Sequence, residues 1–180
     1  MRWFWIDRFT EFVSGQRATA VKSVSLSEEV LEQYAPLRTY LPASLIVEGI
    51  AQTAGLLVGQ MSDFQARVVL AKVSKCKFHC QAFPGDTLTY QVELGPQEGI
   101  GSVARGVSKI GDRLQAEIEL MFASLDDERF GEVELFEPAE FCRMIRLLRL
   151  FEVGVNPDGT PIRVPPHMTE AEKAYLRIGV

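Results

Sequence analysis

One carboxylate interrupts an otherwise apolar stretch of this chain. Glu48 lies in YAPLRTYLPASLIVEGIAQTAG, residues 34–55, in a part that we interpret as helical. Carboxylates are among the side chains that transfer protons in enzymes, so Glu48 is a candidate acid or base. Gln52 lies one helical turn later on the same face, where it could orient Glu48 or hydrogen-bond a substrate carbonyl. Alternatively, both are structural: backbone N–H groups or an arginine across a subunit interface satisfy Glu48, and Gln52 bonds only to its neighbours.

A long helix is predicted to carry these two residues. The segment 43–61 contains few β-branched residues and follows Pro42, a residue well tolerated where a helix begins. Apolar side chains lie nearly all round it, at Leu45, Ile46, Val47, Ile50, Ala51, Ala54, Leu56, Leu57 and Val58. That pattern is typical of a helix surrounded by protein, so we expect a central helix.

Strands are predicted on both sides of this helix. They span residues 17–26, 66–78, 87–94, 101–110 and 113–125. The clearest alternation is LTYQVEL, which needs one covered face, and the turn FPGD precedes it. Since the helix is too apolar to face water, the antiparallel strands must curl around it.

Beyond residue 125 the alternating pattern of the strands ends. Acidic residues lead into EPAEFCRMIRLLRLF, an amphipathic helix with Arg143, Arg146 and Arg149 along one stripe. Another short helix is expected at residues 169–176. We therefore predict a domain at residues 1–125 and an extension at 126–180, with one amphipathic helix and an irregular tail.

Composition excludes several classes of protein. The 180 residues are 47% hydrophobic with a net charge of −5, and no dense basic run offers a site for nucleic acid. Cys76, Cys80 and Cys142, with one nearby histidine, His79, do not make a four-ligand metal site. We expect reduced thiols, no metal and no cofactor. Charged residues interrupt the apolar start MRWFWIDRFTEF, and no run reaches the ~20 residues of a membrane span, so a soluble, cytoplasmic protein is expected.

Several segments resemble one family. IDRFTEFVSGQRATAVKSVSLSEE, LPASLIVEGIAQTAG and KFHCQAFPGDTL are similar to the β-hydroxyacyl-(acyl carrier protein) dehydratases. The resemblance is strongest from Ile6 to Asp86 and weakens towards Leu125, about two thirds of the chain. It implies an α+β hot dog fold, in which a curled antiparallel sheet wraps one long helix.

The family's chemistry removes water from a 3-hydroxyacyl thioester. A base takes the proton next to the carbonyl, an acid protonates the departing hydroxyl, and hydrogen-bond donors stabilise charge on the thioester oxygen. The resemblance places Glu48 at the carboxylate position. It places the Ala43 backbone N–H at the donor position, usually a glycine, and Pro42 and Gln52 beside them as substrate-binding residues.

The family's catalytic histidine is replaced. The family carries His-Phe-Pro fourteen residues before the carboxylate, and this chain has Tyr34-Ala35-Pro36 there. Tyrosine, with an ordinary pKa of about 10 against about 6.5 for histidine, is a poor base at neutral pH. Tyr34 therefore either donates a hydrogen bond to substrate in an altered proton relay or only fills the space of the missing imidazole.

Three hypotheses for function follow. The first is a dehydratase-like lyase of fatty acid metabolism, acting on 3-hydroxyacyl thioesters of acyl carrier protein or coenzyme A through Glu48 and Tyr34. The second is a thioesterase in which Glu48 acts with water, and the third is a non-catalytic acyl-binding or scaffolding protein. The resemblance also implies a homodimer or an oligomer of dimers. A further alternative is a mixed complex in which a second hot dog chain supplies the histidine. The arginine stripe is a candidate docking site for an acidic acyl carrier protein.

Overall fold

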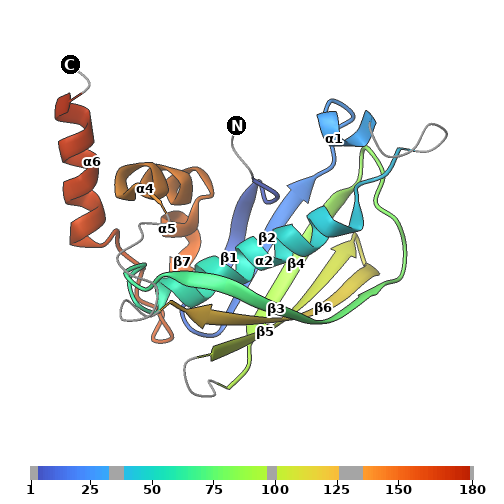
Figure 1. The fold of residues 1–180 in the computed structure, drawn as a ribbon, viewed down its shortest axis with the longest axis horizontal. Coiled ribbons are helices and arrows are strands. Elements are labelled where there is room, and N and C mark those ends of the chain that lie inside the picture. The colour runs from blue at the N-terminus through green and yellow to red at the C-terminus, as the bar shows by residue number, and fades with distance from the viewer. Residues whose placement is uncertain (1–3, 33–38, 97–100, 126–135, 179–180) are drawn as a thin grey trace.

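The structure is a computed structural model that describes residues 4–32, 39–96, 101–125 and 136–178. A sheet surrounds one long helix, and shorter helices lie beside it (Figure 1). The strands are β1 (Arg8–Val13), β2 (Arg17–Ser23), β3 (Val68–Phe78), β4 (Thr87–Leu94), β5 (Gly101–Ile110), β6 (Arg113–Ser124) and β7 (Gly154–Val155). The helices are α1 (Glu29–Glu32), α2 (Ala43–Gln60), α4 (Pro138–Leu147), α5 (Leu150–Val153) and α6 (Pro166–Ile178).

The sheet has the order β3-β6-β5-β4-β2-β1-β7. Neighbouring strands are antiparallel except β1 and β7, which are parallel. α2 contacts β2, β3, β4, β5 and β6, so the sheet curls around the helix. The predicted α+β hot dog architecture is confirmed.

β4 illustrates why the alternating segments form strands. Leu88, Tyr90 and Val92 are buried, while Thr87, Gln91 and Glu93, which alternate with them, are exposed. Strand residues point alternately to the two faces, so the sequence pattern becomes one buried face and one open face. The predicted fourth strand, 101–110, has the same limits as β5.

α2 packs very closely on the sheet at two glycines. A Cβ at Gly49 would lie 2.5 Å from the Tyr90 ring, and a Cβ at Gly106 of β5 would lie 2.4 Å from Ile50 Cγ2. Only glycine allows such an approach without displacing a neighbour. These contacts fix the depth at which the helix sits in the curled sheet.

The face of α2 away from the sheet differs from expectation. Val47, Glu48, Gln52 and Gly55 are only partly buried, and Ala43 is exposed. The near-continuous apolar pattern predicted a helix covered all round. Within the described residues, one face of α2 instead remains partly open.

The segment after residue 135 belongs to the same core as the sheet. Cys142, Ile145, Leu148 and Leu150 are buried in that core, and the Phe9 N–H donates to the Leu148 carbonyl at 2.8 Å. α5 packs on β1, and β7 continues the sheet beside it. The predicted amphipathic helix is confirmed as α4, whereas β1 and β7 were not predicted.

Candidate functional site

Glu48 and Gln52 form a hydrogen-bonded pair on the partly open face of α2. Gln52 Nε2 donates to Glu48 Oε1 at 3.1 Å, and Gln52 Oε1 accepts from the Trp5 backbone N–H at 2.9 Å. The carboxamide is therefore used at both ends, which fixes its orientation. Among the described residues Glu48 Oε2 accepts no hydrogen bond, so that oxygen is available to a ligand.

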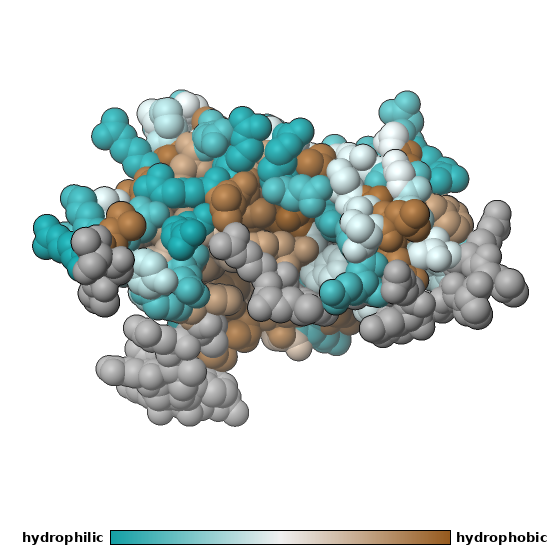
Figure 2. Space-filling view, turned by 90° about the horizontal axis from the view of Figure 1, so that it is seen from above, coloured by the Kyte–Doolittle hydropathy of each residue, from teal (hydrophilic) through white to brown (hydrophobic). Residues whose placement is uncertain are grey.

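The pair lies on the floor of a large groove. The floor is one face of α2, since its residues are spaced by three or four: Glu48, Ala51, Gln52, Gly55, Leu56 and Gly59. It runs about 16 Å along the helix at 1.5 Å per residue. The groove has a volume of about 1840 Å³. Viewed from above (Figure 2), this side of the molecule has hydrophobic residues near its middle and hydrophilic residues around them.

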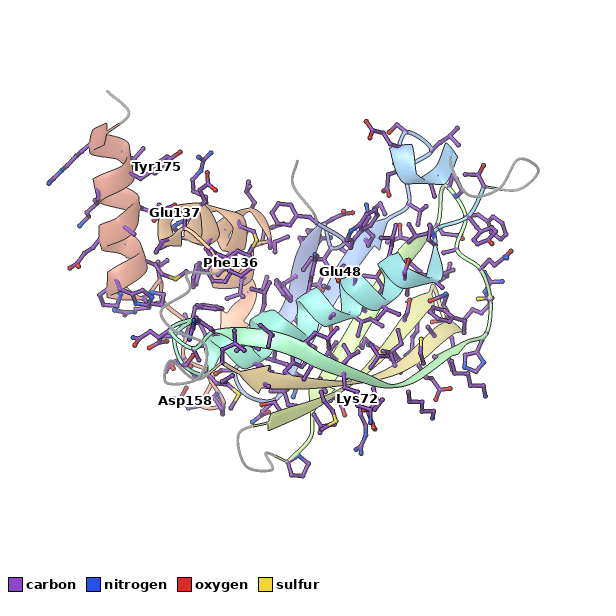
Figure 3. All side chains as sticks on the ribbon, viewed as in Figure 1. Glu48, Lys72, Phe136, Glu137, Asp158 and Tyr175 are labelled. Atoms are coloured by element: carbon purple, nitrogen blue, oxygen red, sulfur yellow. The ribbon has the colours of Figure 1, made fainter. Side chains whose placement is uncertain are left out.

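Two walls flank this floor. One wall is the start of β3 and the residues before it, which include Arg67, Val68 and Leu70. The other comes from residues 136–148, with His167 and Met168 of α6. Figure 3 shows Glu48 on α2 and Phe136 at the entry to α4, and both line the groove. Glu48 thus faces a largely apolar space, and residues 136–148 with α6 close one side of it.

The amino end of α2 has a free donor. Pro42 precedes the helix, and among the described residues the Ala43 N–H donates to no protein group. The first N–H groups of a helix lack intrahelical partners and carry the positive end of its dipole, so this N–H suits an oxygen that gains negative charge. Pro42 and Ala43 are not among the residues that line the groove.

The structure thus brings together part of the predicted site. Glu48 and Gln52 share the groove floor, and Ala43 lies five residues earlier, about 7.5 Å along the helix axis. Tyr34 lies outside the described residues. The roles of all these side chains stay predictions.

Sequence reasoning missed the wall that follows residue 135. Phe64, in the turn that follows α2, packs edge-on against Phe141 with ring centroids 5.6 Å apart, and Phe136 stacks on Phe141 at 5.1 Å. These rings tie α4 to the end of the central helix. The amphipathic pattern of residues 137–151 indicated an apolar face, but it did not indicate that part of this face borders the groove with Glu48.

The arginine stripe is largely paired. Arg146 makes two hydrogen bonds of 2.9 Å to the Glu172 carboxylate, and Arg149 bonds Glu152 at 2.6 Å. Hydrogen bonding from Arg146 lowers the pKa of Glu172. The pKa of the Cys142 thiol is raised to about 11, mainly because the thiol is buried and also because it lies beside the Glu172 carboxylate. Arg143, without an ion pair among the described residues, borders the groove.

Neither histidine takes the place of the missing one. His79 is exposed, as expected, but directly follows β3 and is not part of a strand; its ring bonds Glu117 at 2.9 Å. His167 lines the groove from α6, which lies beyond the carboxyl end of α2, whereas Glu48 lies in the amino-terminal half of that helix (Figure 1). In the described residues no group of three or more His, Cys, Asp or Glu could hold a metal ion, and no helix is long and apolar enough to cross a membrane.

Sequence comparisons with known proteins identify one family, and a comparison of structures identifies the fold. The model of the FabA-like domain matches residues 3–119. The chain is 34% identical over 122 residues to the 3-hydroxyacyl-[acyl-carrier-protein] dehydratase FabZ of Macrococcus caseolyticus, covering 67% of this chain and 84% of that protein. It is 37% identical over 123 residues to the same enzyme of Symbiobacterium thermophilum, covering 67% and 86%. Among solved structures, the dehydratase heterocomplex ApeI:P of Xenorhabdus doucetiae has a similar fold, with a TM-score of 0.59, 16% identity, and coverage of 71% of this chain and 87% of that one.

Proposed function

This chain belongs to the FabA-like domain family, and we propose that it is a dehydratase of 3-hydroxyacyl thioesters in fatty acid metabolism, with a proton relay that uses Glu48 and Tyr34. The proposal is supported by relatives named as 3-hydroxyacyl-[acyl-carrier-protein] dehydratases, of which this chain covers more than four fifths. The observation that carries it is the Glu48 carboxylate, held by Gln52 on the floor of an apolar groove.

The proposed reaction breaks a C–H bond and a C–O bond and forms a carbon–carbon double bond. The proton next to the carbonyl leaves, and the 3-hydroxyl departs with a proton as water. Glu48 carries one of these protons, through Oε1, which Gln52 holds, or through Oε2, which has no hydrogen-bond partner in the described part of the chain. Tyr34 donates a hydrogen bond to the substrate where the family has histidine.

The amino end of α2 stabilises the charge that develops on the thioester oxygen. The Ala43 N–H donates to that oxygen, and Pro42 sets the start of the helix so that this N–H stays outside the helical hydrogen bonds. Because the donor is part of the backbone, it needs no reorganisation during the reaction. The acyl chain then lies in the groove along the helix, beside Gly55 and Leu56.

The proposed enzyme works as a homodimer on substrates carried by acyl carrier protein or coenzyme A. The dimer is supported by β3, an edge strand in the described sheet whose residues from Leu70 to Phe78 are exposed. It is also supported by the open groove, because a monomer would leave this apolar surface in water. Arg143 is the residue of the arginine stripe best placed to meet an acidic carrier at the groove.

One assay tests the reaction. The protein is incubated with 3-hydroxyacyl and saturated acyl thioesters of both carriers, and enoyl product and free thiol are followed together. We expect enoyl product from wild type and its loss in Glu48→Gln, which keeps nearly the same shape but cannot transfer the proton. Glu140→Gln is the matched control, because Glu140 borders the same groove from α4 and has no proposed role in the reaction.

The outcomes separate the alternatives. Free thiol without enoyl product would mean hydrolysis, and tight binding with neither product would mean an acyl-binding protein. Enoyl product that appears only when a histidine-bearing relative is added would mean a mixed dimer. Unchanged enoyl formation in a folded Glu48→Gln protein would remove Glu48 from the mechanism.

A further inference from the structure

Lys22 is a charged residue on the buried face of β2. It follows Ala18 and Ala20 on that face, and only 8% of its surface is exposed. Lysine is almost never buried to this extent unless an opposite charge pairs with it. Its ammonium lies 2.6 Å from the Glu28 carboxylate and 3.6 Å from that of Asp7. The proposed reaction uses none of these three groups, which we call the Lys22 cluster.

Stability alone does not account for a buried ion pair of this kind. The side chain of Lys22 is 10% exposed and that of Glu28 is 17% exposed, so both have lost most of their hydration. This loss offsets the attraction between the charges, and apolar residues of similar size often stabilise a fold as well. The role of the pair therefore follows from what it holds in place.

The Lys22 cluster holds residues 5–7. Lys22 Nζ lies over the Trp5 ring, 5.8 Å from its centroid, which is within the range of a cation–π interaction. The Asp7 carboxylate pairs with the same ammonium and also accepts from the Ser23 N–H at 2.7 Å. One buried ammonium thus contacts this segment at two points, the Trp5 ring and the Asp7 side chain.

Trp5 in turn lies directly against α2 beside Glu48. Its N–H donates to Gln52 Oε1 at 2.9 Å, and a Cβ at Gly49 would lie 2.7 Å from its carbonyl oxygen. Gln52 then donates to Glu48 Oε1 at 3.1 Å. The contacts therefore run without a break from Lys22 through Trp5 and Gln52 to the candidate carboxylate.

We propose that Lys22 is a positioning residue: the Lys22 cluster holds Trp5 against α2, and this fixes the orientation of the Glu48 carboxylate. The inference rests on the proposed dehydratase function and adds to it a group that does not line the groove. Loss of the ammonium lets Trp5 move, and Gln52 loses a fixed partner. Transition-state contacts of Glu48 then suffer more than binding of the acyl chain, so kcat falls while KM changes little.

The test removes both buried charges together, so that neither is left without its partner. The cluster variant is Lys22→Met with Glu28→Gln, at nearly constant size. The matched control is Arg17→Met with Glu11→Gln. That pair also joins β1 to β2, but it lies at the other end of β2, with side chains 48% and 45% exposed. Circular dichroism checks the fold of both full-length proteins, and Lys22→Gln with Glu28→Gln replaces the cluster variant if that one does not fold.

Two measurements follow Trp5 and the reaction separately. The chain has two tryptophans, so every protein in the test also carries Trp3→Phe, and acrylamide quenching of the remaining indole reports the exposure of Trp5. In the cluster variant we expect the quenching constant to rise at least about twofold, and kcat for enoyl formation to fall about tenfold with KM within about twofold. The control variant should match its Trp3→Phe parent in both measurements.

Each outcome decides one statement. Unchanged quenching in the folded cluster variant would overturn the inference, whatever its activity. Raised quenching with unchanged kcat would mean that Trp5 moves without disturbing Glu48, and this would overturn the positioning role of Lys22. If the Trp3→Phe parent and wild type both form no enoyl product, the dehydratase proposal fails, while raised quenching would still support the anchoring of Trp5 by Lys22.

Discussion

Gln52 connects Glu48 to the backbone of Trp5, because its carboxamide donates to Glu48 Oε1 and accepts from the Trp5 N–H. Two segments that are 47 residues apart thus meet at the candidate carboxylate. A carboxylate that must reach a substrate proton needs such support, since a displacement of about 1 Å can cost a hundredfold in rate. Gln52 is therefore proposed as a positioning residue.

Gln52→Met should separate positioning from binding. Methionine has a similar size but can replace neither hydrogen bond, so Glu48 loses its fixed orientation. We expect kcat to fall about 10- to 100-fold with little change in KM. Because the Trp5 N–H loses this acceptor, the free energy of unfolding should also fall by about 1–3 kcal/mol.

Steady-state kinetics and urea unfolding measure the two effects separately. Gln52→Glu is the informative second variant, since it keeps an acceptor for Trp5 but sets a second carboxylate beside Glu48. Like charges at this spacing repel each other, so this variant should lower kcat as Gln52→Met does and should regain little stability. A Gln52→Met protein with wild-type kcat would show that the pair is only structural.

Gly106 should tolerate no side chain. The Cβ of an alanine there would lie 2.4 Å from Ile50 Cγ2, and Ile50 is fully buried on α2, so the helix or the strand must move. Overpacking of this kind typically costs about 1–3 kcal/mol, and we expect Gly106→Ala to lose that much unfolding free energy.

Gly95→Ala is the control for this substitution. Its Cβ would lie 3.5 Å from the Val103 carbonyl oxygen, an ordinary contact, so the change should stay within about 0.5 kcal/mol. Denaturant unfolding of both variants tests the difference. Equal stability of the two would mean that α2 does not sit as deep in the sheet as described.

The sequence pattern predicts the strands well because local alternation and turn residues determine them. The limits of β5 agree with the predicted segment, and β6 ends within one residue of it. The pattern of α2 predicts burial but not what buries each face, since that depends on partners distant in the chain. Gly55 counts neither for nor against burial in such a pattern, yet it is only partly buried and lines the groove.

In the extension, too, the sequence pattern predicts an apolar face but not the distant segments that bury it. The sequence predicts an amphipathic helix here, but the burial of Ile145 and Leu148 depends on segments distant in the chain. The Leu148 carbonyl accepts from the Phe9 N–H of β1, more than a hundred residues away, and α5 packs on the same strand. β1 itself carries Phe9 and Phe12 at a spacing of three, not two, and its pairing with β2 has an irregularity between Phe9 and Glu11. Its alternation is therefore broken. The boundary near residue 125 stays a prediction.

The Arg146–Glu172 pair should make stability depend on pH. Hydrogen bonding from Arg146 lowers the pKa of folded Glu172 below the ordinary 4.5, so the pair stabilises the fold above that value and loses its effect as pH falls through the folded pKa. Glu172→Gln should cost about 1 kcal/mol near neutral pH, since a bidentate pair between α4 and α6 exceeds a common surface pair.

The difference in unfolding free energy between wild type and Glu172→Gln should disappear in acid. Thermal unfolding at several pH values from neutral to about 3 measures this difference. Glu152→Gln is the control, because the Arg149–Glu152 pair is exposed on both sides and links neighbouring turns. A constant difference at all pH values would mean that the effect of Glu172 comes from packing and not from its charge.

Tyr34→His should raise the dehydration rate, because it restores an imidazole at the position where the family has one. Glu48 and the Ala43 N–H remain in place, and general acid–base catalysis contributes typically 10²–10⁴-fold, so partial restoration should be measurable as enoyl product. The pH profile of kcat should then gain a transition near 6.5, the ordinary pKa of histidine.

The neighbours of Tyr34 set the size of this gain. Ala35 stands where the family has phenylalanine and Ala43 where it has glycine, so a new ring is less well supported than in the relatives. The triple variant Tyr34→His, Ala35→Phe, Ala43→Gly should therefore exceed the single one. If the folded triple variant forms enoyl product no faster than wild type, the missing imidazole is not what limits the reaction, and hydrolysis or acyl binding becomes the better account of the groove.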